Sequence, residues 1–203
     1  MDKCKGKSHK GFLYLGIALY KMGYYEQCIK AYIKSNELFA EEPQLHYNLG
    51  LAYFKQEHYT LAVEHLKTCT QLDPTNCYAY NNLAFIYNMH QYYQETINVC
   101  NTAKQMLEKY ERGKNQENFM RGNTPSGEED QEEVNHTCHR HWAFALYKRG
   151  EMAKAIKQIK RAVQLDGKDP DNWIVWGLIL RTVGNYKSAM HKFKQAEKLD
   201  PEN

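Results

Sequence analysis

The stretch "HYNLGLAYFKQEHYTLAVEHL", residues 46–66, consists of two apolar runs separated by the polar joint "KQEHY". In the first run Leu49 and Tyr53 lie four residues apart, and the second run, which ends at Leu66, also has helical spacing. The stretch therefore predicts a helix, a tight turn and a second helix. Gly50 lies inside the first run, where a core normally holds a bulky side chain, and this placement needs a physical reason.

The small residue at Gly50 recurs along the chain. Equivalent residues occur at Gly16, Gly50, Ala84, Ala143 and Gly177, with intervals of 34, 34, 59 and 34 residues. Two further small positions follow it in each unit: first Cys28, Ala62, Thr96, Ala155 and Ala189, then Ser35, Cys69, Ala103, Ala162 and Ala196. Repeat units of this length bury their apolar faces against neighbouring units. The chain therefore accommodates five units.

Small residues inside a helix allow close helix packing. Two antiparallel helices approach closely where one presents only a hydrogen atom or a methyl group, while flanking Leu, Tyr and Phe supply bulk. Glycine costs about 1 kcal/mol of helix propensity at such a place, and the closer packing offsets this cost. The segments "QLDPTN", "QLDGKDP" and "KLDPEN" end the second helices of units two, four and five. The pattern predicts five helical hairpins.

These residues resemble the tetratricopeptide repeat family, whose pattern combines a bulky residue, Leu-Gly, Tyr, Ala, an aromatic residue, Ala and Pro. Unit two matches with Leu49-Gly50, Tyr53, Ala62, Leu66, Cys69 and Pro74, and unit five with Trp173, Trp176-Gly177, Ala189, Phe193, Ala196 and Pro201. Departures from the pattern are Thr96 and Cys100 in unit three, and Gly167 where Pro is usual.

The resemblance implies an all-α fold: a right-handed α-solenoid of five helix-turn-helix repeats in a single domain, 1–203. The repeats cover about 9–42, 43–76, 77–110, 136–169 and 170–203. A loop is inserted between the third and fourth repeats.

The interval of 59 residues places this insertion at 111–135. Its text, "ERGKNQENFMRGNTPSGEEDQEEVN", is polar and acidic and has almost no apolar anchors. The early part of the segment is compatible with a continuation of the preceding helix. Ser126 precedes "GEED", a context that acidophilic kinases accept, and Thr124 precedes Pro125. The segment is therefore either an enlarged connection or a site of regulatory phosphorylation, which would add negative charge.

Composition narrows the functional classes. The 203 residues are 42% hydrophobic and 25% charged, as in a globular protein. A net charge of +3, without a basic stripe that alternates with aromatic residues, argues against nucleic acid. The lysine-rich start followed by "FLYLGIALY" imitates a signal peptide, but this run matches the repeat helix "HYNLGLAYF". We therefore expect a soluble, intracellular protein without membrane insertion, most readily cytoplasmic, with ciliary, cytoskeletal or other organellar assemblies open.

The sequence points to no catalytic, cofactor or metal site. Cys28, Cys69 and Cys100 fall at interior positions of second helices, where a thiol acts as a small apolar side chain. In "HTCHRH", residues 136–141, pairs of potential zinc ligands occur three residues apart but face at least two directions on one helix. Neither a glycine-rich phosphate loop nor a nucleophile elbow is present. We expect no enzyme activity.

The resemblance implies a concave groove formed by the first helix of each repeat. The side chains expected to face it are Leu13, Tyr14, Ile17, Tyr20, Tyr47, Asn48, Leu51, Phe54, Tyr78, Asn81, Asn82, Phe85, Arg140, Phe144, Tyr147, Ile174, Leu178 and Arg181. Asn48 and Asn82 occupy equivalent places, where amides in similar repeats bind the backbone of a peptide. Alternatively, some of the aromatic residues only fill the seam between helices. The apolar and amide character of the groove favours an amphipathic helix or an extended apolar segment of another protein.

A rival function is binding of an acidic chaperone tail. Repeats of this family that do so hold the tail carboxylates with two lysines, two asparagines and an arginine. At the matching places this chain has Leu13, Ile17, Asn48, Tyr78 and Asn82, of which only Asn48 fits. A groove without these cations does not compensate the desolvation of a carboxylate. A co-chaperone adaptor is therefore disfavoured.

The last repeat ends at "KLDPEN" without a further helix to cover its apolar side chains. Met190, Phe193 and Leu199 are expected to dock end-on against another subunit, unless the side chains of His191, Lys194 and Lys198 cover them. Together these features predict a non-catalytic scaffold or adaptor subunit of a larger intracellular assembly.

Overall fold

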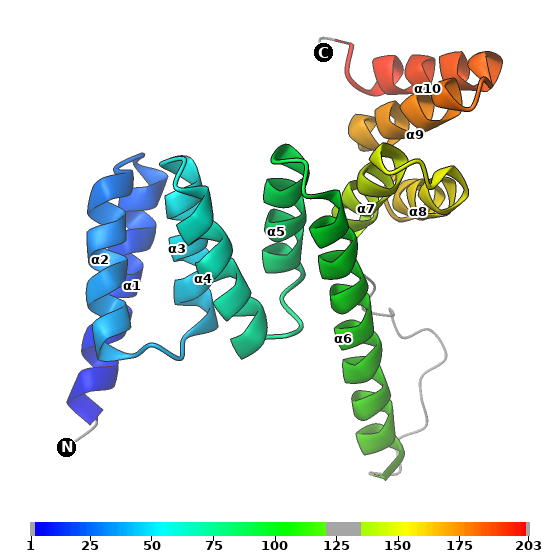
Figure 1. Ribbon diagram of the computed structural model, residues 1–203. Helices are drawn as coiled ribbons and strands as arrows, with labels where there is room; N and C mark the ends of the chain where they lie inside the picture. Colours follow the sequence, from blue (N-terminus) through cyan, green and yellow to red (C-terminus); the bar gives the residue numbers. More distant parts are fainter. Residues whose placement is uncertain (1–2, 121–134, 202–203) are drawn as a thin grey trace. The chain divides into compact units, whose positions relative to one another are not determined.

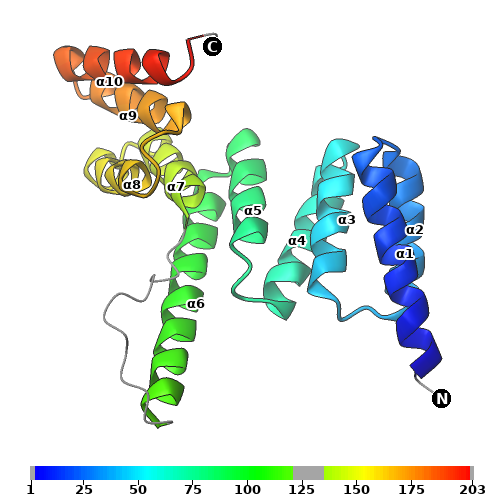
Figure 2. The ribbon, with the colours of Figure 1, turned by 180° about the vertical axis from the view of Figure 1, so that it is seen from behind.

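In the computed structural model, the described residues 3–120 and 135–201 form ten α-helices and no strand. In chain order the helices are α1 (Lys3–Lys21), α2 (Tyr25–Leu38), α3 (Pro43–Lys55), α4 (Tyr59–Leu72), α5 (Cys77–Met89), α6 (Tyr93–Met120), α7 (His136–Lys148), α8 (Met152–Leu165), α9 (Pro170–Thr182) and α10 (Tyr186–Leu199) (Figure 1). Successive helices pack in pairs, α1 with α2, α3 with α4, α7 with α8 and α9 with α10 (Figure 2). The predicted all-α fold of helical hairpins is confirmed.

The chain divides into two compact units, Met1–Leu83 and Ala84–Asn203. Helix α6 extends to Met120, so the first part of the predicted insertion 111–135 continues the preceding helix. The borders of the five repeats and their assignment to a single domain stay predictions.

The turns inside the hairpins share one backbone conformation. At the same place in all five hairpins one residue has a positive φ: Gly23, Glu57, Gln91, Gly150 and Gly184, with φ angles of 80°, 60°, 63°, 80° and 79°. Glycine adopts this left-handed conformation without steric cost, whereas the side chains of Glu57 and Gln91 make it less favourable. Proline occupies the first turn of α3 and α9, where its missing N–H is tolerated. Local chemistry thus sets where each hairpin begins and turns.

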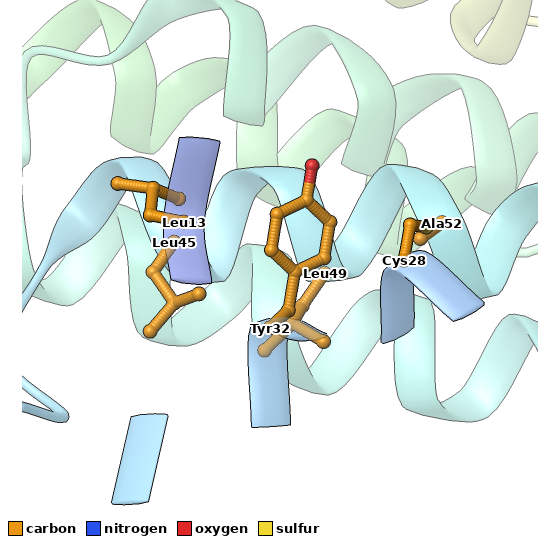
Figure 3. Packing of buried hydrophobic residues seen from close by; sticks show 6 residues of the cluster. All are labelled: Leu13, Cys28, Tyr32, Leu45, Leu49 and Ala52. Carbon is orange, nitrogen blue, oxygen red and sulfur yellow. The ribbon is translucent and has the colours of Figure 1, made fainter. Parts of the chain in front are cut away.

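The core of the first unit joins three helices. Leu13 from α1 and Tyr32 from α2 lie with Leu45 and Leu49 from α3 in one buried cluster, which also includes Cys28 and Ala52 (Figure 3). The first hairpin therefore completes its core with the first helix of the next one, as expected of stacked repeats. The predicted burial of the second-helix cysteines is also confirmed, since Cys28, Cys69 and Cys100 are fully buried.

Close approach between paired helices occurs at the repeated glycines. A Cβ atom added at Gly16 would lie 2.2 Å from Cε1 of Tyr32, and one at Gly177 would lie 2.4 Å from Cε1 of Phe193. At Gly50 the added atom would lie 2.7 Å from Cγ of Leu66. These distances are far below van der Waals contact, so each glycine leaves the space that the partner's large side chain fills. The prediction that small residues permit close helix packing is confirmed.

Helix α1 offers a matched pair of glycines to test this packing. Gly16→Ala should destabilise the fold by about 1–3 kcal/mol, because Tyr32 must move to admit the methyl group. Gly11→Ala, in the same helix with no atom within 4 Å of the added Cβ, should instead stabilise by up to about 1 kcal/mol. Urea unfolding followed by circular dichroism measures both free energies. Equal effects of the two substitutions would contradict the proposed contact.

Candidate protein-binding site

The groove residues of the first unit come from α1, α3 and the start of α5. Tyr14 and Tyr78 are 64% and 68% exposed, while Ile17 and Leu51 are partly buried. The prediction that Leu13 faces the groove is wrong, because this residue is 3% exposed and packs in the core with Tyr32 and Leu45. The unit thus presents exposed tyrosines on α1 and α5. Leu13, at one of the positions that a carboxylate clamp would use, is not accessible.

Asn48 and Asn82 occupy equivalent places in sequence but have different surroundings. Nδ2 of Asn82 donates to the backbone oxygen of Tyr78 at 2.8 Å and to the hydroxyl of Tyr47 at 3.3 Å. Nδ2 of Asn48 is buried and has no hydrogen-bond partner among the described residues. An unpaired buried donor costs about 1–3 kcal/mol. The amide of Asn82 is therefore occupied within the unit, whereas Nδ2 of Asn48 is enclosed without a hydrogen-bond partner among the described residues.

In the second unit, the predicted groove residues Phe144 and Phe85 make three contacts with other rings. The ring of Phe144 lies 6.4 Å from that of Tyr93 and 6.1 Å from that of Tyr147, and Nζ of Lys148 lies 5.3 Å from its centroid. Phe85 is exposed, with its ring 5.8 Å from the imidazole of His141. Ile174 and Leu178 on α9 are partly buried. Phe144 thus fills a seam between helices, as one of the alternatives for the aromatic residues requires.

Two other predicted groove residues are buried or ion-paired within their own units. Asn81 is buried at 8% exposure, so it offers little surface to a partner. The guanidinium of Arg140 pairs with Asp169 and lies 3.5 Å from Oδ2 of Asp171. Arg140 therefore links α7 to α9.

The three residues predicted to dock end-on differ in exposure. Met190 and Leu199 are exposed, but the ring of Phe193 lies against Gly177 and belongs to the seam of its own hairpin. Lys192, which sequence reasoning missed, places its Nζ 3.8 Å from the ring centroid of Trp176 and 4.9 Å from that of Trp173. These two indoles stack with centroids 5.7 Å apart. Docking at this end stays a prediction, resting on Met190 and Leu199.

The histidines and the cysteine of "HTCHRH" bind to different neighbours. Nε2 of His136 lies 3.6 and 3.4 Å from carboxylate oxygens of Asp166 and Asp169, whereas Nδ1 of His139 bonds Oε1 of Gln158 at 2.8 Å. The Cys138 carbonyl oxygen accepts from the thiol of Cys100 at 3.7 Å. In the part of the chain that the structure describes, no group of three or more potential ligands is placed to hold a metal. Thr124 and Ser126 lie outside the described residues.

A second unforeseen feature recurs in three hairpins. His46 and His65 face each other with their Nδ1 atoms 3.0 Å apart, and Nε2 of His46 bonds the oxygen of Ala40 at 2.8 Å. The first helix and the second are linked at the same spacing of 19 residues by His139 with Gln158 and by Trp173 with Lys192. Burial and then the neighbouring His46 lower the pKa of His65, which favours its neutral form. The 34-residue period identifies the linked residues as equivalent positions of different hairpins, but it does not show that they contact each other.

Comparison with known proteins agrees with this architecture. Residues 43–76 match the model of the Tetratricopeptide repeat family. Among solved structures, MamA from Desulfovibrio magneticus RS-1 superposes with a TM-score of 0.72 over 97% of both chains, at 14% identity. The structure of YrrB, described as a TPR protein with an unusual peptide-binding site, gives 0.68 over 100% of this chain and 95% of that one, at 13% identity. Residues 43–76 are therefore a tetratricopeptide repeat, a type of interaction module, and the chain has the helical solenoid fold of these solved proteins.

A shorter stretch is similar to Intraflagellar transport protein 70B. The bovine (Bos taurus) protein is 39% identical over 56 residues, which are 28% of this chain and 8% of the relative. The mouse (Mus musculus) protein is 34% identical over 58 residues, 29% of this chain and 9% of the relative. The matched stretch thus spans less than a tenth of the length of these relatives. None of the described helices combines the length and the apolar character that crossing a bilayer requires.

The two asparagines should have opposite effects on stability. Asn82→Ala removes two hydrogen bonds and should lower the free energy of unfolding by about 1 kcal/mol. Asn48→Ala removes a buried donor that has no partner within the described chain, and should leave the free energy unchanged or raise it. Urea unfolding of each variant tests this difference. A larger loss for Asn48→Ala than for Asn82→Ala would show that Asn48 is satisfied within the fold.

The stability of the second unit should depend on pH through His141. Burial and then the charge of Arg140 lower the pKa of this imidazole from 6.5 to about 4. The imidazole of His141 therefore binds a proton less readily in the folded state than in the unfolded state. The free energy of unfolding is accordingly highest above pH 6.5 and decreases as the pH falls towards 4. Between neutral pH and the lower end of this range, wild type should lose about 2–3 kcal/mol more than His141→Gln. Urea unfolding across this range measures the difference, and parallel curves for the two proteins would refute it.

Proposed function

We propose that the protein is a non-catalytic scaffold or adaptor subunit that binds a segment of another protein through the first-helix face of residues 1–83. The bound segment is apolar, either an amphipathic helix or an extended strand of chain. The site comprises Tyr14, Ile17, Tyr47, Asn48, Leu51, Tyr78 and Asn82. In the second unit, the corresponding predicted groove residues are Phe85, Phe144, Ile174 and Leu178, of which Phe144 also packs in the seam between helices.

The unpartnered Nδ2 of Asn48 is the observation that supports this proposal most directly. Rotation of the Asn48 side chain, whose Nδ2 has almost no accessible surface in the free chain, would bring this donor to a backbone carbonyl of a bound segment and relieve the cost of a buried, unpaired donor. Exposed rings of Tyr14 and Tyr78 add apolar contact area with few rotatable bonds, which keeps the entropic cost of binding low. An apolar segment with accessible backbone carbonyls therefore matches both kinds of group.

The similarity to Intraflagellar transport protein 70B supports a place in a cilium-related assembly. The exposed Met190 and Leu199 offer a further contact for a neighbouring subunit at the end of the last hairpin. In such an assembly the groove would hold one partner while the last hairpin packs against another.

The test compares partners of wild type and of the Asn48→Ala variant. Tagged protein purified from ciliated cells, followed by mass spectrometry, identifies a partner, and the interacting segment is then made as a peptide for calorimetry. Asn48→Ala should weaken its binding by about five- to 150-fold, since one buried hydrogen bond is lost. Asn101→Ala provides the matched control, because Asn101 is exposed on α6.

A peptide that binds Asn48→Ala and wild type with equal affinity, while circular dichroism shows both to be folded, would exclude this groove as its site. Failure to recover any partner protein enriched by wild type over the untagged background would count against the scaffold role itself.

A further inference from the structure

Positive charge is concentrated on the second helices of the last two hairpins. Helices α8 and α10 together contain eight lysine or arginine residues and a single acidic residue, Glu197. Since the whole chain has a net charge of only +3, its remaining residues are net negative. The corresponding helices α2 and α4 of the first unit contain equal numbers of lysines and glutamates. The concentration is therefore not a general property of second helices in this chain.

Basic residues lie in stripes along the two helices. Lys154, Lys157 and Arg161 follow one another at intervals of three and four residues on α8, which places them on one face about 5–6 Å apart. Lys187, His191, Lys194 and Lys198 do the same over three turns of α10. All seven side chains belong to exposed residues. We call these residues the basic face.

Few acidic groups of the chain neutralise the basic face. Glu151 pairs with Lys154, at 2.8 Å, at the start of α8. Among the described residues, however, Lys157, Lys187, Lys194 and Lys198 form no ion pair.

The positive fields of the two helices also reach one another. Burial and then the charge of Lys160 on α8 lower the pKa of Lys192 on α10. Helix α9 packs against both α8 and α10. Uncompensated like charges repel and reduce stability, so a surface of this kind gains most from an anionic partner.

We propose that the basic face binds an acidic segment of a partner protein, at a site distinct from the apolar groove. Glutamates on successive turns of a helix have the same spacing of 5–6 Å as the lysines, and alternate residues of an extended chain lie about 6.6–6.8 Å apart. Either form of an acidic tract can therefore pair its carboxylates with consecutive cations. Carboxylate or similar anionic groups provide this complementarity, because the stripes present basic side chains on successive turns.

Direct binding experiments with the full chain test this site. A fluorescent oligoglutamate peptide should bind wild type, and its affinity should fall as the salt concentration rises past about 0.15 M, where the charges are screened. Lys157→Glu with Lys194→Glu should weaken binding about tenfold. The same double reversal at the exposed Lys30 and Lys67 of the second helices α2 and α4 is the control and should change binding little.

The groove variant and competing polyanions separate the alternatives. Asn48→Ala should bind oligoglutamate as wild type does, so that this site and the groove can fail independently. Lys157→Gln with Lys194→Gln, which avoids new charges, replaces the reversal if the latter misfolds. The proposal is overturned if oligoglutamate does not bind, if the control weakens binding equally, or if single-stranded nucleic acid or vesicles of anionic lipid bind more tightly than the peptide.

Discussion

The contact between a residue with almost no side chain and a large side chain on the paired helix is the constraint on which each hairpin depends. Gly16 faces Tyr32, Gly50 faces Leu66 and Gly177 faces Phe193, in every case sixteen residues further along the chain. Where the first position is Ala84 or Ala143 instead, the equivalent second position holds Cys100 or Ile159, neither of which is aromatic. In the three glycine-containing hairpins the absent side chain thus provides the space that the large partner fills.

Much of this architecture is predictable from sequence because it repeats. The 34-residue period identifies the small positions, the helical spacing identifies the apolar faces, and the buried cysteines follow from both. Prediction was less successful within a face. Leu13 and the exposed Tyr14 were both expected to face the groove, but Leu13 packs against Tyr32 and Leu45, and that contact involves two other helices. Periodicity gives the direction of a side chain only to within about one residue.

The candidate site shows the same division between pattern and contact. Asn48 and Asn82 are equivalent by period, yet Nδ2 is bonded only in Asn82, which donates to the oxygen of Tyr78 in its own helix and to the hydroxyl of Tyr47. The positive charge on α8 and α10 could have been found from sequence, since "KAIKQIKR" has its cations at helical spacing. What sequence could not provide is which of these basic residues have a carboxylate partner among the described residues, because that depends on where the neighbouring elements place their acidic groups.

The links formed across nineteen residues have a consequence for how such a chain can change in evolution. A pair of imidazoles in one hairpin, an imidazole with an amide in another and a lysine over two indoles in a third all occupy the same place. A second helix transplanted from one hairpin to another would meet the wrong chemical partner: Lys192 would face His46, and Gln158 would face Trp173. Recombination that respects these links must exchange whole hairpins. The heritable module is therefore the helix pair, and duplication followed by divergence within a pair requires that both members change together.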